Sequence, residues 1–469
     1  MNKSEGSETG LPGSDPTSAV EPLVLPTSPR RVGGGVRLNI RGRSVRLRRL
    51  RRQPTGALRW LLLLGPGLIA TSAGNDAGGI ATYSSAGARF GYDLIWVMVV
   101  LTVSYAVVQE MCARLGAATG RGLLDLIRER YGVGWALFAV CVIMAANGGV
   151  TVSEFVGIGA AMELLGFNKY VVVPLAAGLI WYLVVFGSYA RVERVFLLMT
   201  LVFFAYPAAA FMARPDWGAV ARGAFVPTLR GDPEYILLLV GLLGTTMTPY
   251  IQLFQQSSVV EKGVARRHYG PERLDAYVGA FFSNLMSVFM IIATAATLNA
   301  AGRTEIGSAA DAARALEPVA GPAAQALFAV GLLGASLLAG AVLPLATSYA
   351  VTEALGVPKG VNLDFRRARV FFSLFTALVV AGAGLALVPG LPVIQMLVAV
   401  QVLNGVLLPV MLVFILLLIN DRRLTGELKN TRLYNVLGWG TFAVITAAVA
   451  FMLGSQFLDS LGIRILGDR

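Results

Sequence analysis

The residue in this sequence most able to do chemistry is an aspartate inside a long apolar stretch. Asp76 lies near the middle of residues 57–88, within the run SAGNDAGG at positions 72–79. A carboxylate at the centre of a membrane span is costly unless it faces water, a cation or a partner. No basic residue lies near it in this stretch or in residues 233–258, which are interrupted in a similar way. We therefore expect Asp76 to bind a cation.

Two of the apolar stretches contain helix-breaking residues. Residues 57–88 contain GPG at 65–67 and the glycines around Asp76, and residues 233–258 contain GLLGTTMTP at 241–249. Glycine weakens a helix by about 1 kcal/mol and proline by about 3 kcal/mol. Because lipid cannot hydrogen-bond a broken backbone, such breaks persist where they line a polar cavity, although a simple kink without a ligand is the alternative for 233–258. Freed carbonyls beside one carboxylate are the oxygen ligands that a hard cation needs.

The elements that must position these residues are membrane-spanning helices. The chain has 469 residues, of which 56% are hydrophobic and only 14% charged, whereas a soluble domain is about 25% charged. This composition excludes an ordinary soluble enzyme. Eleven stretches are long enough to cross a hydrocarbon core about 30 Å thick, which takes roughly 20 residues. They are 57–88, 93–115, 134–165, 170–189, 192–213, 233–258, 275–300, 323–350, 368–388, 391–419 and 434–456.

The order of these stretches and the positions of the charges indicate how they are arranged. Ten of the eleven can form two halves of five in which the first stretch of each half is interrupted, a pattern that points to a transporter site between inverted repeats. If the N-terminus is inside, 30 of the 39 Lys and Arg residues fall on inside segments and 9 on outside ones. This asymmetry predicts a multi-pass protein of the cell membrane with a cytoplasmic N-terminus and an extracellular C-terminus.

Residues 1–56 and 457–469 flank the predicted transmembrane domain, 57–456. The first segment is polar and rich in Gly, Ser and Pro, so we expect a disordered cytoplasmic tail. It carries ten arginines between Arg30 and Arg52, which could neutralise the phosphates of a nucleic acid. Next to a membrane span, we favour an arginine-rich segment that fixes topology and touches anionic lipid, with no nucleic acid as partner. The second segment is expected to be a short extracellular tail.

Several motifs together resemble one known family. The run from GPG at 65–67 through Asp76 to AGARFGY at 86–92 is the longest of them. Further matches are Glu154 with Gly157, Arg191 to Arg194, Gly244 to Pro249, and Asp275 with Asn284. Over about 57–456 the sequence resembles the Nramp family of divalent metal transporters. The resemblance implies an all-α integral membrane protein of eleven transmembrane helices with a LeuT-type fold, in which two inverted five-helix repeats hold the metal between broken helices.

The sequence also departs from this family at the expected site. Where the family has Asp-Pro-Gly-Asn, residues 76–79 read DAGG, so the asparagine ligand is missing. Where the family has methionine before the proline, this chain has Thr248. A thioether favours soft transition ions, whereas hydroxyl, carbonyl and water ligands suit magnesium, which keeps several of its waters. The pattern resembles the Nramp-related magnesium transporters. The alternative is that Met247, one position earlier, turns its sulfur toward the ion.

Residue by residue, the resemblance implies six candidate metal ligands. They are Ala73, Asp76, Gly79, Thr245, Thr248 and Gln401. Asp76 would be the charged ligand or would accept from metal-bound water, and Thr248 would replace the methionine. Thr245 and Ala73 would offer backbone carbonyls, and Gly79, at the vacated asparagine position, could contribute only its backbone. Gln401 lies where family members carry a glutamine near the ion, with an interhelical hydrogen bond as the alternative role.

Proton coupling in this family uses titratable groups that are mostly absent from this chain. The resemblance places Thr151 where the family has an aspartate, and Tyr250 and Gln255 at its histidine positions, which leaves Glu154. We expect alternating-access uptake of a divalent cation, with magnesium as the first expectation and manganese as the second, and with little or no proton coupling. The membrane potential would drive it by about 2.3 kcal/mol per charge per 100 mV.

Three other functions stay open at this point. The first is a proton-coupled manganese or iron importer of the same fold, and the second is a membrane metal sensor or scaffold that transports nothing. The third is an amino-acid carrier, which Asp76 disfavours because a helix break that captures a substrate carboxylate should not hold a fixed negative charge. No phosphate loop or nucleotide-binding fingerprint is present, which disfavours an ATP-driven pump. We expect no enzyme activity and no cofactor other than the transported metal ion.

Overall fold

A computed structural model describes residues 36–40, 43–47, 75–186, 204–261, 263–264, 269–360, 363 and 365–461. The chain divides into two compact units, Met1–Arg59 and Trp60–Arg469, and each is described by itself. In the first unit, β1 (Val36–Ile40) pairs antiparallel with β2 (Arg43–Leu47). This hairpin lies inside the segment that composition predicts to be disordered.

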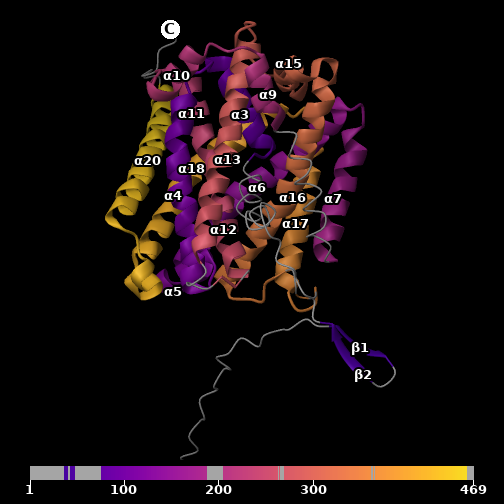
Figure 1. Cartoon of the computed structure of the whole chain (residues 1–469), viewed down its shortest axis with the longest axis vertical. Coiled ribbons are helices and arrows are strands. Elements are labelled where there is room, and N and C mark those ends of the chain that lie inside the picture. The colour runs from indigo at the N-terminus through magenta and orange to yellow at the C-terminus, as the bar shows by residue number, and fades with distance from the viewer. Residues whose placement is uncertain are drawn as a thin grey trace, which may run out of the picture. The chain divides into compact units, whose positions relative to one another are not determined.

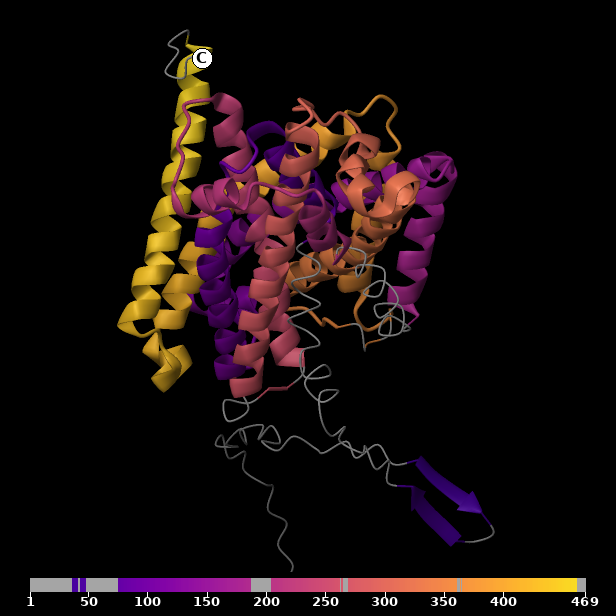
Figure 2. The same ribbon diagram turned by 45° about the horizontal axis from the view of Figure 1, so that its top comes forward.

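The second unit is a bundle of helices (Figure 1, Figure 2). Its main helices are α3 (Ala77–Phe90), α4 (Ile95–Thr119), α5 (Leu123–Tyr131), α6 (Val133–Leu164), α7 (Lys169–Val185), α9 (Ala205–Met212), α10 (Trp217–Phe225), α11 (Pro233–Thr246), α12 (Pro249–Glu261), α13 (Tyr269–Thr294), α16 (Ala324–Leu355), α17 (Arg369–Ala386), α18 (Val393–Asn420) and α20 (Arg432–Ser460). The shorter ones are η3 (Ala295–Asn299), α14 (Ala309–Ala313), η4 (Arg314–Leu316), α15 (Glu317–Ala320), η5 (Gly321–Ala323), α19 (Arg422–Thr425) and η6 (Gly426–Leu428). In both views, α7 and α20 lie on opposite sides of the bundle.

The helices confirm the membrane class. In the described part of the chain, eight helical segments are long and apolar enough to cross a membrane, and α7 is a shorter apolar helix. The eight correspond to the second, third and sixth to eleventh predicted spans. Parts of the first and fifth predicted spans fall outside the described residues, so the count of eleven stays a prediction.

Both expected interruptions coincide with helix ends. α3 begins at Ala77, in the middle of the apolar stretch 57–88, with Asp76 as its N-cap residue. α11 ends at Thr246, and α12 begins at Pro249 after a two-residue break. Proline has no N–H and cannot continue the helical hydrogen bonds of the preceding turn. The break predicted in 233–258 is therefore present, and in 57–88 the described residues show a helix that begins only at Ala77.

Three glycines allow the helices that carry the breaks to approach closely. A Cβ on Gly244 of α11 would lie 1.9 Å from the carbonyl oxygen of Gln401 on α18, and one on Gly405 would lie 2.5 Å from the carbonyl oxygen of Val240. A Cβ on Gly157 of α6 would lie 2.5 Å from Cβ of Ala77. Distances this short are steric clashes, so only glycine permits these contacts. They bring α6, α11 and α18 against one another near the start of α3.

Candidate functional site

Asp76 is fully buried at the start of α3 and is held by hydrogen-bond donors. Its Oδ1 accepts from the backbone N–H of Gly79 at 2.6 Å, the usual contact of an N-cap side chain. The positive end of the helix dipole also lies at this end of α3 and stabilises a negative charge. Among the described residues, no ion pair includes Asp76. Its charge is therefore balanced by neutral groups only.

Two amides on α18 extend this arrangement. Gln401 donates from Nε2 to both carboxylate oxygens of Asp76, at 3.1 and 3.4 Å. Its Oε1 accepts from Nδ2 of Asn404 at 2.8 Å. All three side chains are fully buried. The contact places Gln401 directly beside Asp76, and it is the interhelical hydrogen bond expected as its alternative role.

The end of α11 supplies oxygens that are not yet used. The hydroxyls of Thr245 and Thr248 are buried and have no hydrogen-bond partner in the described part of the chain. The carbonyl of Thr245 lies four residues before Pro249, where a continuous helix would need an N–H that proline lacks. The hydroxyl of Thr246 lies 3.3 Å from that of Tyr83, which joins the end of α11 to α3. Neutral oxygens with free lone pairs at a helix C-terminus favour a cation.

Met247, the alternative ligand, is fully buried and belongs to the hydrophobic core. It is the C-cap residue of α11, and its carbonyl accepts from Nε2 of Gln252 at 3.1 Å. Its backbone oxygen is therefore already bonded.

The remaining predicted ligands are placed differently. Gly79 lies in the first turn of α3 and uses its N–H on Asp76. Ala73 lies outside the described residues. Within the described part of the chain, no group of three or more His, Cys, Asp or Glu side chains could hold a metal ion. A cation bound here would therefore be held by fewer than three such side chains, together with neutral oxygens.

The structure adds two residues to the site. Glu154 of α6 is fully buried, and its Oε2 accepts from the N–H of Ala77 at 3.3 Å, so it occupies the first turn of α3 beside Asp76. Asn404 fixes Gln401, as described above. Both could have been found from sequence, because each is a polar residue inside an apolar span, and Asn404 follows Gln401 at helical i,i+3 spacing.

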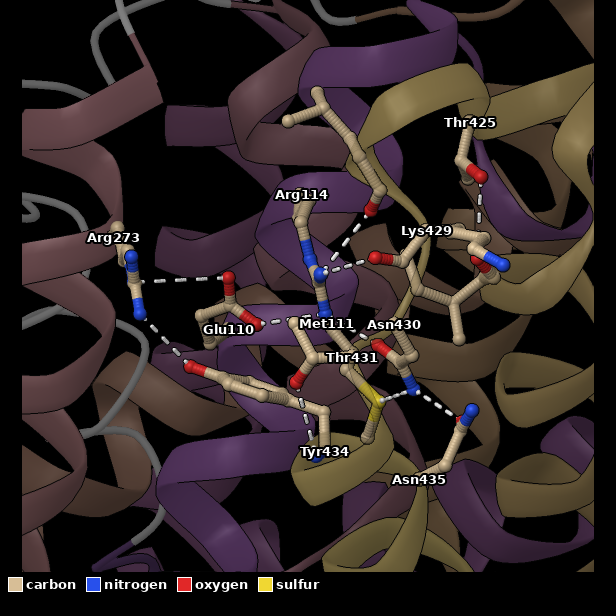
Figure 3. Close-up of polar contacts among 12 residues, drawn as sticks. Glu110, Met111, Arg114, Arg273, Thr425, Lys429, Asn430, Thr431, Tyr434 and Asn435 are labelled. Atoms are coloured by element: carbon tan, nitrogen blue, oxygen red, sulfur yellow. Dashed lines mark hydrogen bonds and ion pairs between the residues drawn. The ribbon is translucent and has the colours of Figure 1, made fainter.

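Another buried acid, Glu110, lies in the second half of α4, outside the site. Glu110 pairs with Arg114 at 3.1 Å and approaches Arg273 of α13 at 4.0 Å (Figure 3). Arg114 also donates to the side chain of Asn430 and lies 5.0 Å above the ring of Tyr434. Glu110 and Arg114 are four residues apart in the sequence, a spacing that favours an ion pair on a helix, and the structure has that pair. The cluster ties α4, α13 and the start of α20 together.

Comparisons with known proteins agree with this geometry. The family model for natural resistance-associated macrophage protein-like proteins, Nramp, matches residues 67–455. A divalent metal cation transporter MntH of Deinococcus radiodurans is 30% identical over 415 residues, which cover 85% of this chain and 91% of the relative. One of Ralstonia nicotianae is 31% identical over 419 residues, which cover 83% and 90%.

Among solved structures, the Eremococcus coleocola manganese transporter, in complex with an aromatic bis-isothiourea substituted compound, superposes with a TM-score of 0.67. The match covers 87% of this chain and 92% of that one at 18% identity, so it shows the fold. The all-α, LeuT-type fold expected from the sequence is confirmed. Because the family model covers most of the chain and relatives at 30% identity cover more than four fifths of it, the protein belongs to the Nramp family.

Proposed function

We propose that this protein moves divalent metal cations across a membrane by alternating access, with the cation bound between α3, α11 and α18. The observation that carries the proposal is Asp76, a fully buried carboxylate without a cationic partner among the described residues, at the point where α3 begins in mid-span. A buried charge of this kind is costly unless it is compensated. A transported cation would supply the missing charge. The names of the curated relatives, divalent metal cation transporters, support the same function.

Each group of the site would have a definite role. Asp76 is the charged ligand, or the acceptor for a water bound to the metal. Thr245 offers its carbonyl and its hydroxyl, and Thr248 offers its hydroxyl. In the described part of the chain, neither hydroxyl has a hydrogen-bond partner. Gln401 contacts Asp76 directly and is the fourth group in reach of an ion there. The ion would thus meet one full negative charge and several neutral oxygens.

This donor set favours magnesium as the main substrate and manganese as a second one. Each candidate metal ligand can offer a side-chain oxygen, which hard cations prefer. The ligands are Asp76, Thr245, Thr248 and Gln401. Few protein ligands also leave positions for the waters that magnesium gives up reluctantly.

Transport in this proposal has little or no coupling to protons. At the positions where the resemblance expects titratable groups, Thr151 donates to the carbonyl of Asn147 at 2.7 Å, and residue 250 is a tyrosine. Glu154 accepts from the N–H of Ala77 and so helps to hold α3. The membrane potential alone favours entry of a divalent cation by about 4.6 kcal/mol at 100 mV, twice the value for one charge.

A proton-coupled manganese importer is the second candidate. Glu154 favours it, because a second buried acid at the first turn of α3 offers a place for a proton close to Asp76. One solved structure with the same fold is that of a manganese transporter.

Uptake into proteoliposomes tests the proposal and separates the two candidates. The wild-type chain and the Asp76→Asn variant are reconstituted in parallel with Asp459→Asn, which changes an exposed aspartate near the end of α20. We expect uptake of Mg²⁺ and Mn²⁺ by the wild type and by Asp459→Asn, and none above background by Asp76→Asn. Wild-type uptake by Asp76→Asn would contradict the proposed site. An internal pH dye that acidifies in step with the metal would favour the proton-coupled importer.

The tail and the orientation are further parts of the proposal. We place the N-terminus in the cytoplasm, with the arginine-rich segment against anionic lipid. Deletion of residues 1–50 should leave transport into proteoliposomes intact, which would argue against a sensor or scaffold that depends on its tail. Loss of all transport would contradict the purely topological role given to the tail.

A further inference from the structure

We propose that Asn404 is a positioning residue that sets the direction of the Gln401 amide, and that the two amides turn over together when a cation binds at Asp76. In the structure, Gln401 turns its NH2 group toward Asp76 and donates to the carboxylate. In the metal-bound state, it turns its oxygen toward the ion. The inference rests on the proposed function of Asp76 as cation ligand.

The chemistry of the three groups fixes the present direction of the amides. An ionised carboxylate only accepts hydrogen bonds, so the end of Gln401 that faces Asp76 must be the NH2 group. The distances of 3.1 and 3.4 Å from Nε2 to the two carboxylate oxygens agree. The opposite end of Gln401 is then an oxygen, and it needs a donor, which Asn404 supplies through Nδ2 at 2.8 Å.

A cation beside Asp76 makes this direction unfavourable. The NH2 group of Gln401 carries partial positive charge and has no lone pair to offer a metal ion, whereas its Oε1 does. A half-turn about the last side-chain bond exchanges the two ends. This bond has broad, roughly two-fold preferences, so the turn itself costs little torsional energy. It would, however, bring Nε2 of Gln401 against Nδ2 of Asn404, and two buried donors facing each other leave a hydrogen bond unmade.

Asn404 can avoid this contact between two donors because its own oxygen is available as an acceptor. Oδ1 of Asn404 is buried and has no hydrogen-bond partner in the described part of the chain. If Asn404 turns over as well, Oδ1 accepts from Nε2 of Gln401, and the contact between the two side chains is kept. The pair therefore has two hydrogen-bonded arrangements, one with a donor toward Asp76 and one with an acceptor toward it.

The surrounding packing confines the pair to this contact. Gln401 and Asn404 are three residues apart on α18 and lie on the same face of the helix. A Cβ on Gly78 would lie 2.1 Å from Nε2 of Gln401, so the glycine leaves room for the amide against the first turn of α3. Gly244 of α11 lies so close to the backbone of Gln401 that any side chain there would clash. Because α18 is packed against α3 and α11 at Gln401, the amide can change its direction by rotating about its last side-chain bond without a shift of the helix.

Substitutions at Asn404 test the idea through the KM for the metal. Asn404→Leu removes both arrangements, so the turned-over Gln401 would lose its partner, and we expect KM for Mg²⁺ to rise about tenfold, the effect of one buried hydrogen bond. Asn404→Thr carries a hydroxyl that can donate or accept, so it should return KM to within about threefold of wild type. Asn420→Leu is the matched control, because Asn420 is on the same helix but bonds to Leu416 and Asn435, and its KM should not change.

A double substitution separates this role from a merely structural one. If Asn404 acts through Gln401, then Asn404→Leu should have no further effect on KM when Gln401 is already alanine. A tenfold rise in KM that persists in the Gln401→Ala background would overturn the inference, as would an unchanged KM in Asn404→Leu. If Asn404→Leu fails to fold, Asn404→Thr and Asn404→Ala provide the test. The KM for Mg²⁺ should be lower in Asn404→Thr than in Asn404→Ala, because only the hydroxyl can bond to Gln401.

The outcome is distinguishable from failure of the proposed function. If Asp76→Asn transports normally, the cation site itself is wrong. If Asp76→Asn is inactive while every Asn404 variant keeps the wild-type KM, the site stands and the coupled turn of the amides is wrong.

Discussion

Two buried acids in this protein differ in what compensates their charge. Glu110 in the second half of α4 is 2% exposed and meets two arginines, Arg114 and Arg273 (Figure 3). It also accepts from the hydroxyl of Tyr269. Asp76 is 0% exposed and meets the N–H of Gly79 and the amide of Gln401. Both acids lie in apolar spans, and hydropathy alone treats them alike.

The difference teaches how to separate a structural acid from a binding one. A buried carboxylate that has a fixed cationic partner is satisfied within the protein, and removal of one partner leaves an uncompensated charge. A buried carboxylate that has only neutral donors is incompletely compensated, and the missing positive charge can come from a mobile ion. By this criterion Glu110 holds helices together and Asp76 binds the transported cation.

The largest effect is expected from Asp76→Asn. This change removes the one charged ligand of the proposed site and leaves neutral oxygens, so transport of Mg²⁺ should fall about 100-fold or more, which corresponds to about 2.8 kcal/mol. The folded state should survive, because the amide can still accept from Gly79. Initial rates of metal uptake and a thermal unfolding curve in detergent check both parts. Wild-type rates of metal uptake by Asp76→Asn would mean that Asp76, like Glu110, does not bind the transported cation.

Glu110→Gln should have the opposite profile. It leaves Arg114 buried without its counter-charge, so we expect the free energy of unfolding to fall by about 3 kcal/mol. The KM for the metal, measured on the fraction that remains folded, should stay at the wild-type value. A raised KM with unchanged stability would mean that Glu110 takes part in the ion pathway.

Thr248→Met tests whether the proposed site at Asp76 selects between Mg²⁺ and Mn²⁺. A thioether at the break between α11 and α12 adds a soft ligand, so the ratio of Mn²⁺ to Mg²⁺ uptake should rise about tenfold. Competition between the two ions in the same vesicles measures this ratio, with Thr446→Met on the outer helix α20 as control. If the ratio does not rise, position 248 has no role in selecting the ion.

The smallest effect is expected from Arg273→Gln. Arg273 is half exposed and lies 4.0 Å from Glu110, so its ion pair is worth about 1 kcal/mol or less. Thermal unfolding should show a small loss and uptake none. A loss as large as that of Glu110→Gln would show that Arg273, rather than Arg114, is the main partner.

What the sequence could predict was mostly local. The cost of a charge in a span singled out Asp76, proline and glycine located the break between α11 and α12, and i,i+4 spacing gave the pair of Glu110 and Arg114. These inferences need only neighbouring residues. Average composition gives no indication of the pairing of β1 with β2, because it conceals the alternation of apolar and polar residues over Val36–Ile40.

Contacts between distant segments could not be predicted. Nothing local indicates that Glu154 reaches the N–H of Ala77, or that Gln401 meets Asp76 from 325 residues away. Such contacts depend on how whole helices pack, and here on glycines such as Gly157 that let the backbones approach. Gln401 was placed at the site through the family resemblance, and the i,i+3 spacing of Asn404 behind it could have suggested their contact.

Equilibrium binding of Mg²⁺ and Mn²⁺ to the purified protein, measured by calorimetry for Asp76→Asn and Glu110→Gln side by side, tests most directly whether Asp76 is the cation ligand. We expect Asp76→Asn to bind neither ion measurably and Glu110→Gln to bind both with the wild-type Kd. Binding retained by Asp76→Asn, or lost by a folded Glu110→Gln, would contradict this assignment.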